Sequence, residues 1–101
     1  MKLYIDTSDR EKIIIGLGDE RFEEKPNQTT SQRLLPFIEE ILKKEGKNFK
    51  DIKEIEVNTG PGSFTGLRVG VSVANALGWS LGIKVNSKNI QKGEIVDIKY
   101  E

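Results

Sequence analysis

Along one apolar stretch of this chain every fourth residue is glycine or alanine, a spacing that suits close packing against another backbone. The stretch is expected to form a helix over residues 65–81, and its small residues are Gly66, Gly70, Ala74 and Gly78. Residues at this spacing share one side of a helix, so a second backbone can approach that side closely. We call these four residues the small-residue ridge and expect it to seat the helix on a sheet.

Short segments that are apolar or alternate in polarity predict strands on both sides of this helix. The segments cover residues 2–5, 11–17, 20–25, 52–59 and 83–86. The first three would form an antiparallel meander whose charged third strand lies at the outer edge. Residues 94–100 alternate again and could add an edge strand.

A second helix is expected over residues 30–45, because its apolar side chains fall on one broad side and Gly46 follows them. Pro36 removes a backbone donor one turn inside this helix, which predicts a kink or a later start. The order of elements predicts an α/β fold, with a mixed sheet and two main helices. Residues 1–101 are expected to form one domain, with an unassigned tail from about residue 88.

Composition excludes several classes of function. The chain has 101 residues and a formal net charge of zero, so no overall field draws it to a nucleic-acid backbone. It contains no His and no Cys, which removes the commonest metal ligand, the commonest general base and all thiolate chemistry. The first residues lack the apolar core of a signal peptide and no stretch reads as a membrane span, which predicts a cytoplasmic location.

The glycine-rich turn over residues 60–66 stands where a strand meets a helix, a place that can hold phosphate. Its spacing departs from the dinucleotide motif, because three residues separate Gly62 from Gly66, and no P-loop lysine follows. Spacing alone favours a turn that seats the helix on the sheet over one that contacts a ligand. Asp6, Thr7 and Ser8 could bind a metal-bound phosphate, although such residues more often serve only as a turn.

On the side of the helix away from the ridge, the sequence places Arg68, Ser72, Asn75 and Trp79. A large aromatic residue among polar ones is a candidate anchor for a partner protein. The alternatives are that Trp79 is wedged under a loop of its own chain and that Arg68 pairs with a local carboxylate. No nucleophile, base and oxyanion site can be assembled from these residues, so no catalytic residue and no metal ligand is assigned.

Two segments together carry a family resemblance. The run Gly60-Pro61-Gly62-Ser63-Phe64-Thr65-Gly66-Leu67-Arg68 closely resembles the signature of the bacterial TsaB (YeaZ) family, and the run Ile5-Asp6-Thr7-Ser8 is similar to its first strand. Residues 31–38 also resemble that family's first helix, so the resemblance covers about residues 1–87.

The resemblance implies a lobe of the ASKHA fold, which is actin/Hsp70-like and RNase H-like, and a role in making threonylcarbamoyladenosine beside the tRNA anticodon. In this family TsaB is a non-catalytic scaffold that docks the transferase TsaD through two helices, and a third protein, TsaE, hydrolyses ATP. Here the helices would carry the partner-binding residues Arg33, Phe37, Arg68, Ser72, Asn75 and Trp79. The resemblance assigns the chain no cofactor of its own, since partner subunits would bind ATP and magnesium, and tRNA is met only through the complex.

The chain departs from the family pattern because it is expected to hold only the N-terminal lobe, and its last fifteen residues match nothing in that pattern. Nucleotide in this fold lies between two lobes, so one lobe would supply half a site. Two alternatives to the scaffold therefore stay open: a nucleotide-binding half-site completed by another chain, and a homodimer that self-associates through the small-residue helix.

Overall fold

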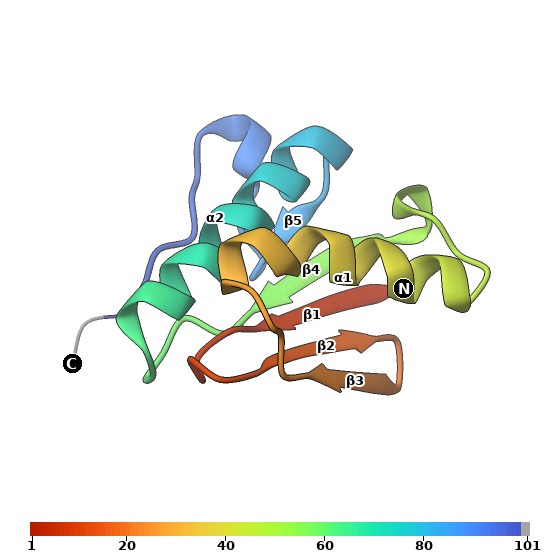
Figure 1. Ribbon diagram of the computed structural model, residues 1–101. Helices are drawn as coiled ribbons and strands as arrows, with labels where there is room; N and C mark the ends of the chain where they lie inside the picture. Colours follow the sequence, from red (N-terminus) through yellow and green to blue (C-terminus); the bar gives the residue numbers. More distant parts are fainter. Residues whose placement is uncertain (100–101) are drawn as a thin grey trace.

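The computed structural model describes residues 1–99, which form a 5-stranded sheet with two long helices on one of its faces (Figure 1). The strands lie in the order β3-β2-β1-β4-β5. Their bounds are Lys2–Asp6 (β1), Ile13–Leu17 (β2), Glu20–Glu24 (β3), Glu54–Val57 (β4) and Lys84–Val85 (β5). The helices are Thr30–Lys44 (α1) and Phe64–Leu81 (α2), with short 3-10 turns at Phe49–Asp51 and Ile90–Lys92.

The sheet is mixed, as the sequence predicted. Strands β1, β2 and β3 form the antiparallel meander, with Ile5 opposite Ile15 and Ile15 opposite Phe22. Strand β4 pairs with β1 in parallel, and β5 pairs with β4 in parallel. Each of these parallel pairs needs a crossover, and α1 and α2 supply the two crossovers on the same face of the sheet (Figure 1).

The core lies between the sheet and the two helices. Alternate strand residues point toward the helices, so Leu3 and Ile5 of β1 and Ile55 and Val57 of β4 are buried. From α1, the residues that recur every three or four positions fill the other side of this layer: Leu34, Phe37, Ile38, Ile41 and Leu42. The helical spacing of the sequence therefore identified the buried side of α1, with the exception of Leu35, which is 38% exposed.

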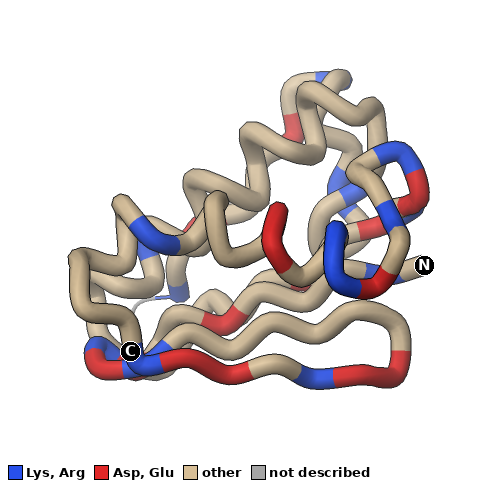
Figure 2. The backbone as a smooth tube through the Cα atoms, turned by 45° about the vertical axis from the view of Figure 1, so that its right-hand side comes forward, with Lys and Arg blue, Asp and Glu red and all other residues tan. Residues whose placement is uncertain are grey.

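Charge gathers at the third strand and is nearly absent from α2 (Figure 2). Strand β3 carries four charged residues among its five, which suits an exposed edge that should not pair with another chain. Over the 18 residues of α2, Arg68 is the one charged side chain. The surface of α2 is therefore almost uncharged.

Two expectations about local structure need correction. Helix α1 begins at Thr30 and runs through Pro36, so of the two alternatives given for Pro36 the later start is wrong. Residues 94–99 add no strand to the sheet: they lie extended beside α2, with Val96 and Ile98 buried. Tyr100, the last residue of that expected strand, lies outside the described residues.

Candidate functional site

The carboxylate of Asp6, at the end of β1, is bound by its own chain. Its Oδ1 accepts hydrogen bonds from the backbone N–H of Ser8 at 3.0 Å, the hydroxyl of Ser8 at 2.6 Å and Nδ2 of Asn58 at 3.1 Å. The hydroxyl of Tyr4 donates to Oδ2 at 3.2 Å. This network joins the end of β1 to the turn that follows β4.

These contacts also set the protonation of the group. Partial burial raises the pKa of Asp6, but the hydrogen bonds from Ser8, Asn58 and Tyr4 favour the charged form and bring the pKa below its ordinary value. Burial, followed by the charge of Asp6, raises the pKa of Tyr4. Asp6 is therefore a stable anion whose role in this structure is to fix the loop.

Thr7 and Ser8 are likewise engaged with the glycine-rich turn. Thr7 is 1% exposed, and its hydroxyl donates to the carbonyl of Gly66 at 2.5 Å. The carbonyl of Ser8 accepts from the backbone N–H of Ser63 at 2.7 Å, and Ser63 caps the start of α2. A phosphate at Asp6, Thr7 and Ser8 remains a prediction that their geometry does not favour, because their polar atoms already bind one another or α2.

The small-residue ridge lies against the sheet, as expected. A Cβ on Gly70 would come closer than 3.0 Å to the hydroxyl of Thr7, and one on Gly78 would do the same to Val85. All four ridge residues are buried. The ridge is therefore not free to contact a second molecule, because Ile5, Thr7 and Val85 already lie against it. A homodimer through the other side of α2 stays a prediction.

The outward side of the two helices carries the remaining predicted residues. Trp79 is 60% exposed, so it is not wedged under a loop, and Arg68 and Ser72 are exposed beside it on α2. Arg68 lies over the ring of Phe64 at 5.5 Å and not in an ion pair among the described residues. We call the exposed set Leu35, Arg68, Ser72, Ala76 and Trp79 the helix face.

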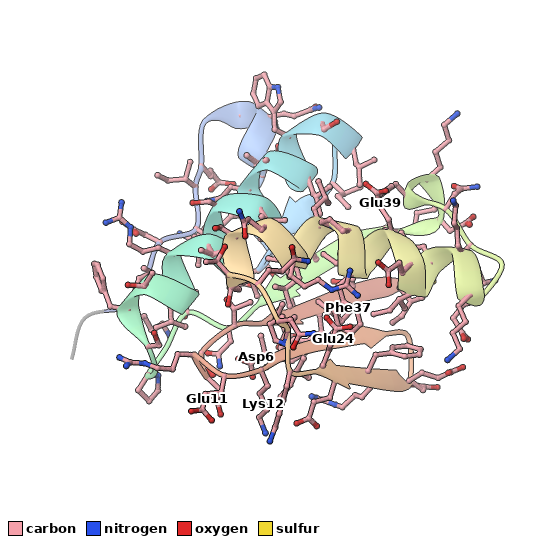
Figure 3. The ribbon with its side chains drawn as sticks, viewed as in Figure 1. Asp6, Glu11, Lys12, Glu24, Phe37 and Glu39 are labelled. Carbon is pink, nitrogen blue, oxygen red and sulfur yellow. The ribbon has the colours of Figure 1, made fainter. Side chains whose placement is uncertain are left out.

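Three of the predicted partner-binding residues, Phe37, Arg33 and Asn75, contact other parts of the lobe. Phe37 is 8% exposed and belongs to the core, under α1 and near Glu24 (Figure 3). Arg33 forms ion pairs with Glu24 of β3 and with Glu40 of α1, and lies over the ring of Phe37 at 5.4 Å. The hydrogen bonds from Arg33 outweigh burial and lower the pKa of the carboxyl groups of Glu24 and Glu40. These residues hold α1 on the sheet.

Asn75 is hydrogen-bonded to the segment 94–99. Its Nδ2 donates to the carbonyl of Val96 at 2.9 Å, and its Oδ1 accepts from the N–H of Val96 at 3.2 Å. Asn75 is therefore half-buried beside this segment, and its role in partner binding stays a prediction.

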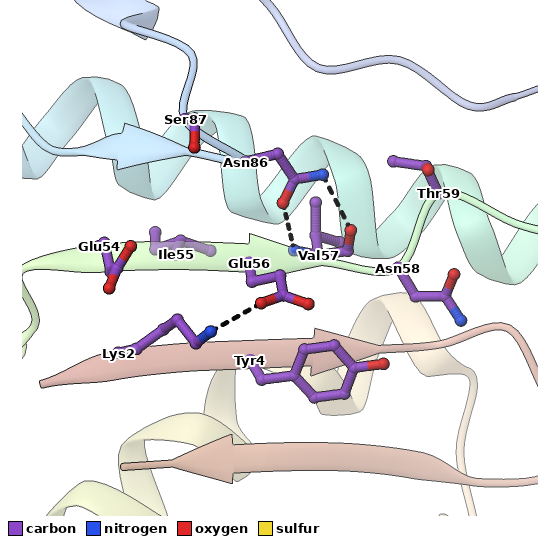
Figure 4. A pocket seen from close by; sticks show the side chains of 10 residues that line it. All are labelled: Lys2, Tyr4, Glu54, Ile55, Glu56, Val57, Asn58, Thr59, Asn86 and Ser87. Atoms are coloured by element: carbon purple, nitrogen blue, oxygen red, sulfur yellow. Dashed lines mark hydrogen bonds and ion pairs between the residues drawn. The ribbon is translucent and has the colours of Figure 1, made fainter.

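Sequence reasoning missed a groove on the sheet face opposite the helices (Figure 4). It is lined by polar residues that alternate with the core residues of β1 and β4, including Lys2, Tyr4 and Glu56, with Asn86 at its rim. Lys2 and Glu56 form an ion pair of 2.7 Å across it. Asn86 bonds the N–H of Val57 at 2.8 Å and its carbonyl at 3.1 Å. Strand alternation would have shown that this face is polar, but not that it is hollow.

No group of three or more acidic, His or Cys side chains that could hold a metal ion occurs among residues 1–99. Within the same part of the chain, neither α1 nor α2 is long and apolar enough to cross a membrane.

A mixed five-stranded sheet with its two crossover helices on one face defines an α/β lobe of the ASKHA type. Residues 24–89 match the family model of TsaD, tRNA N6-adenosine threonylcarbamoyltransferase. The chain belongs to this family, on the TsaB (YeaZ) side of it, as the comparisons with individual relatives show.

Two curated relatives are named tRNA threonylcarbamoyladenosine biosynthesis protein TsaB. The one from Escherichia coli K12 is 40% identical over 62 residues, covering 61% of this chain and 26% of the relative. The one from Bacillus subtilis 168 is 39% identical over 57 residues, covering 56% and 25%. The solved structure of YeaZ from Pseudomonas aeruginosa superposes with a TM-score of 0.71 at 28% identity, over 83% of this chain and 41% of that one. The chain thus spans about a quarter of the curated relatives' length.

Proposed function

We propose that this chain acts in the formation of threonylcarbamoyladenosine in tRNA, as a non-catalytic lobe that docks a TsaD-type transferase through its helix face. Family membership and the names of the TsaB relatives support the pathway. The main support for docking through this face is the exposure of Trp79, which is 60% exposed on a helix with a single charged residue. Exposed tryptophan and arginine side chains are the residue types most enriched at the energetic centres of interfaces.

The chemistry of the chain supports a binding role. The chain has no His or Cys, and the carboxylate of Asp6 accepts hydrogen bonds from Tyr4, Ser8 and Asn58 of the same chain. On this proposal the partner subunits bind ATP and magnesium, a TsaE-type ATPase joins the same complex, and tRNA is met through the complex in the cytoplasm. The helix face has no like-charged cluster that would repel a protein partner, because Arg68 is its single charge.

Titration of the purified chain with the TsaD-type subunit from the same source tests the proposal. We expect Trp79→Ala and Arg68→Glu each to weaken binding at least about tenfold, the range of an interface centre. Lys84→Ala, an exposed change on β5, should leave the affinity unchanged. Unaltered affinity in both helix variants, with their fold intact, would refute docking through this face. Light scattering of the chain alone would show whether the same face forms a homodimer.

A further inference from the structure

The segment 94–99 lies along one flank of α2, and the way it is held is that of a bound peptide. A hollow remains between the two, lined by Arg68, Val71, Ser72 and Asn75 of the helix and by Ile95, Val96, Asp97 and Ile98 of the segment. Side chains alternate along the segment: Val96 and Ile98 are buried against the lobe, whereas Ile95, Asp97 and Lys99 are exposed. This period of two is that of an extended chain laid on a surface.

The side chain of Asn75 forms hydrogen bonds with the backbone of the segment. The amide of Asn75 bonds both the N–H and the carbonyl of Val96, as a neighbouring strand would. Further along, the N–H of Lys99 donates to the carbonyl of Thr59 at 3.0 Å, in the turn that follows β4. Such contacts depend on the main chain and on two aliphatic side chains, and on no other feature of the segment.

The segment joins no strand of the sheet, and the residues that lead to it, 91–94, are all exposed. Two hydrogen bonds hold this connection to the lobe: the side chain of Gln91 donates to the carbonyl of Trp79 at 2.9 Å, and the N–H of Asn89 donates to the carboxylate of Glu94 at 2.6 Å. Gly93 between them has φ of 93°, which gives the connection a left-handed bend. The family match covers the flank of α2 and ends at residue 89, before the segment begins.

We infer that the flank of α2 around Asn75 is a binding site for an extended peptide with two aliphatic residues two positions apart, and that the chain's own residues 94–99 occupy it as a detachable strap. Release of the strap uncovers Val71 and the amide of Asn75 directly beside the helix face. The inference does not depend on the proposed docking of a transferase, because its tests use this chain alone.

Hydrogen exchange on the unaltered chain is the first test. The N–H groups of Val96 and Lys99 should exchange at least a hundredfold faster than those of Leu3 and Ile5 in β1, because the strap opens without unfolding the sheet. Exchange of both sets at one common rate would mean that the segment is an integral part of the fold, and would overturn the inference.

The second test supplies the segment from outside. A labelled, end-blocked peptide of residues 93–99 should bind the full chain carrying Val96→Asp and Ile98→Asp at least tenfold more tightly than the unaltered chain, whose tethered strap competes at high effective concentration. Adding Asn75→Ala to that variant should reduce binding at least fivefold. Lys99→Glu, an exposed change within the same segment, should leave the chain's affinity for the peptide as low as that of the unaltered chain. Equal binding to all of these chains, or to none while the variants stay folded, would refute the site.

Discussion

We expect the substitution Gly70→Ala to destabilise this chain, whereas the same change usually stabilises a helix. In an exposed helix interior this change stabilises by about 1 kcal/mol, because alanine loses less conformational entropy than glycine. Here the new methyl group would lie closer than 3.0 Å to the hydroxyl of Thr7 and in contact with Ile5. Ile5 belongs to β1 and Thr7 directly follows that strand; both are buried, so neither can swing into solvent.

The magnitude follows from these contacts. Forcing a methyl group into a filled core costs about 1–3 kcal/mol, and displacing Thr7 from the carbonyl of Gly66 costs about 1 kcal/mol for the buried hydrogen bond. Helix propensity returns about 1 kcal/mol. We expect Gly70→Ala to lower the free energy of unfolding by about 1–3 kcal/mol, and the midpoint of thermal unfolding by at least about 5 °C.

Urea denaturation followed by circular dichroism measures the change, with Ser72→Ala on the exposed side of the same helix as the control. That control should be neutral or slightly stabilising. Adding Thr7→Ala to Gly70→Ala removes the obstructing hydroxyl, so the double variant should be more stable than the sum of the single losses predicts. A Gly70→Ala chain as stable as the original, or more stable, would refute the view that the ridge is closed by β1.

Three further expectations concern other parts of the lobe. Asn86→Ala should lower the free energy of unfolding by about 1–3 kcal/mol, because it leaves the N–H and carbonyl of Val57 without their partner; urea denaturation that shows no loss would contradict this. Because the folded-state pKa of Asp6 is depressed, its contribution to stability is fully present above its unfolded value of about 4 and is lost as the pH falls through the lower folded value. Unfolding curves recorded between pH 7 and pH 2 should therefore show a shallower acid loss for Asp6→Asn than for the unaltered chain, and identical slopes would contradict the assignment. Arg33→Gln should raise the pKa of Glu24, because its largest depressing partner is removed; carboxyl titration by NMR that shows no rise would contradict the ion pair.

The two helices and the sheet could be predicted from the sequence because each rests on a short-range pattern. The ridge of α2 repeats every four residues, and the buried side of α1 follows the helical period. Phe37 fits that period, so its burial was already implicit in the sequence, although the family resemblance suggested a partner-binding role. The meander needed only alternation and turn residues.

The state of the candidate site residues could not be predicted in this way, because their partners are distant in sequence. Asn75 meets Val96 across 21 residues, and Asp6 meets Asn58 across 52. The segment 94–99 alternates as an edge strand would, and only the folded structure shows that it lies against a helix. Alternation establishes an extended backbone, but it does not establish what that backbone lies beside.

The side-chain amide of Asn86 has a consequence for the behaviour of the chain in concentrated solution. Strand β5 spans only Lys84–Val85, so the last residue of β4 would otherwise present its N–H and carbonyl to any passing strand. Asn86 covers both groups of Val57 with one side chain. A second molecule can pair with Val57 only by first displacing the amide, so a single asparagine protects this point of the sheet against an added strand.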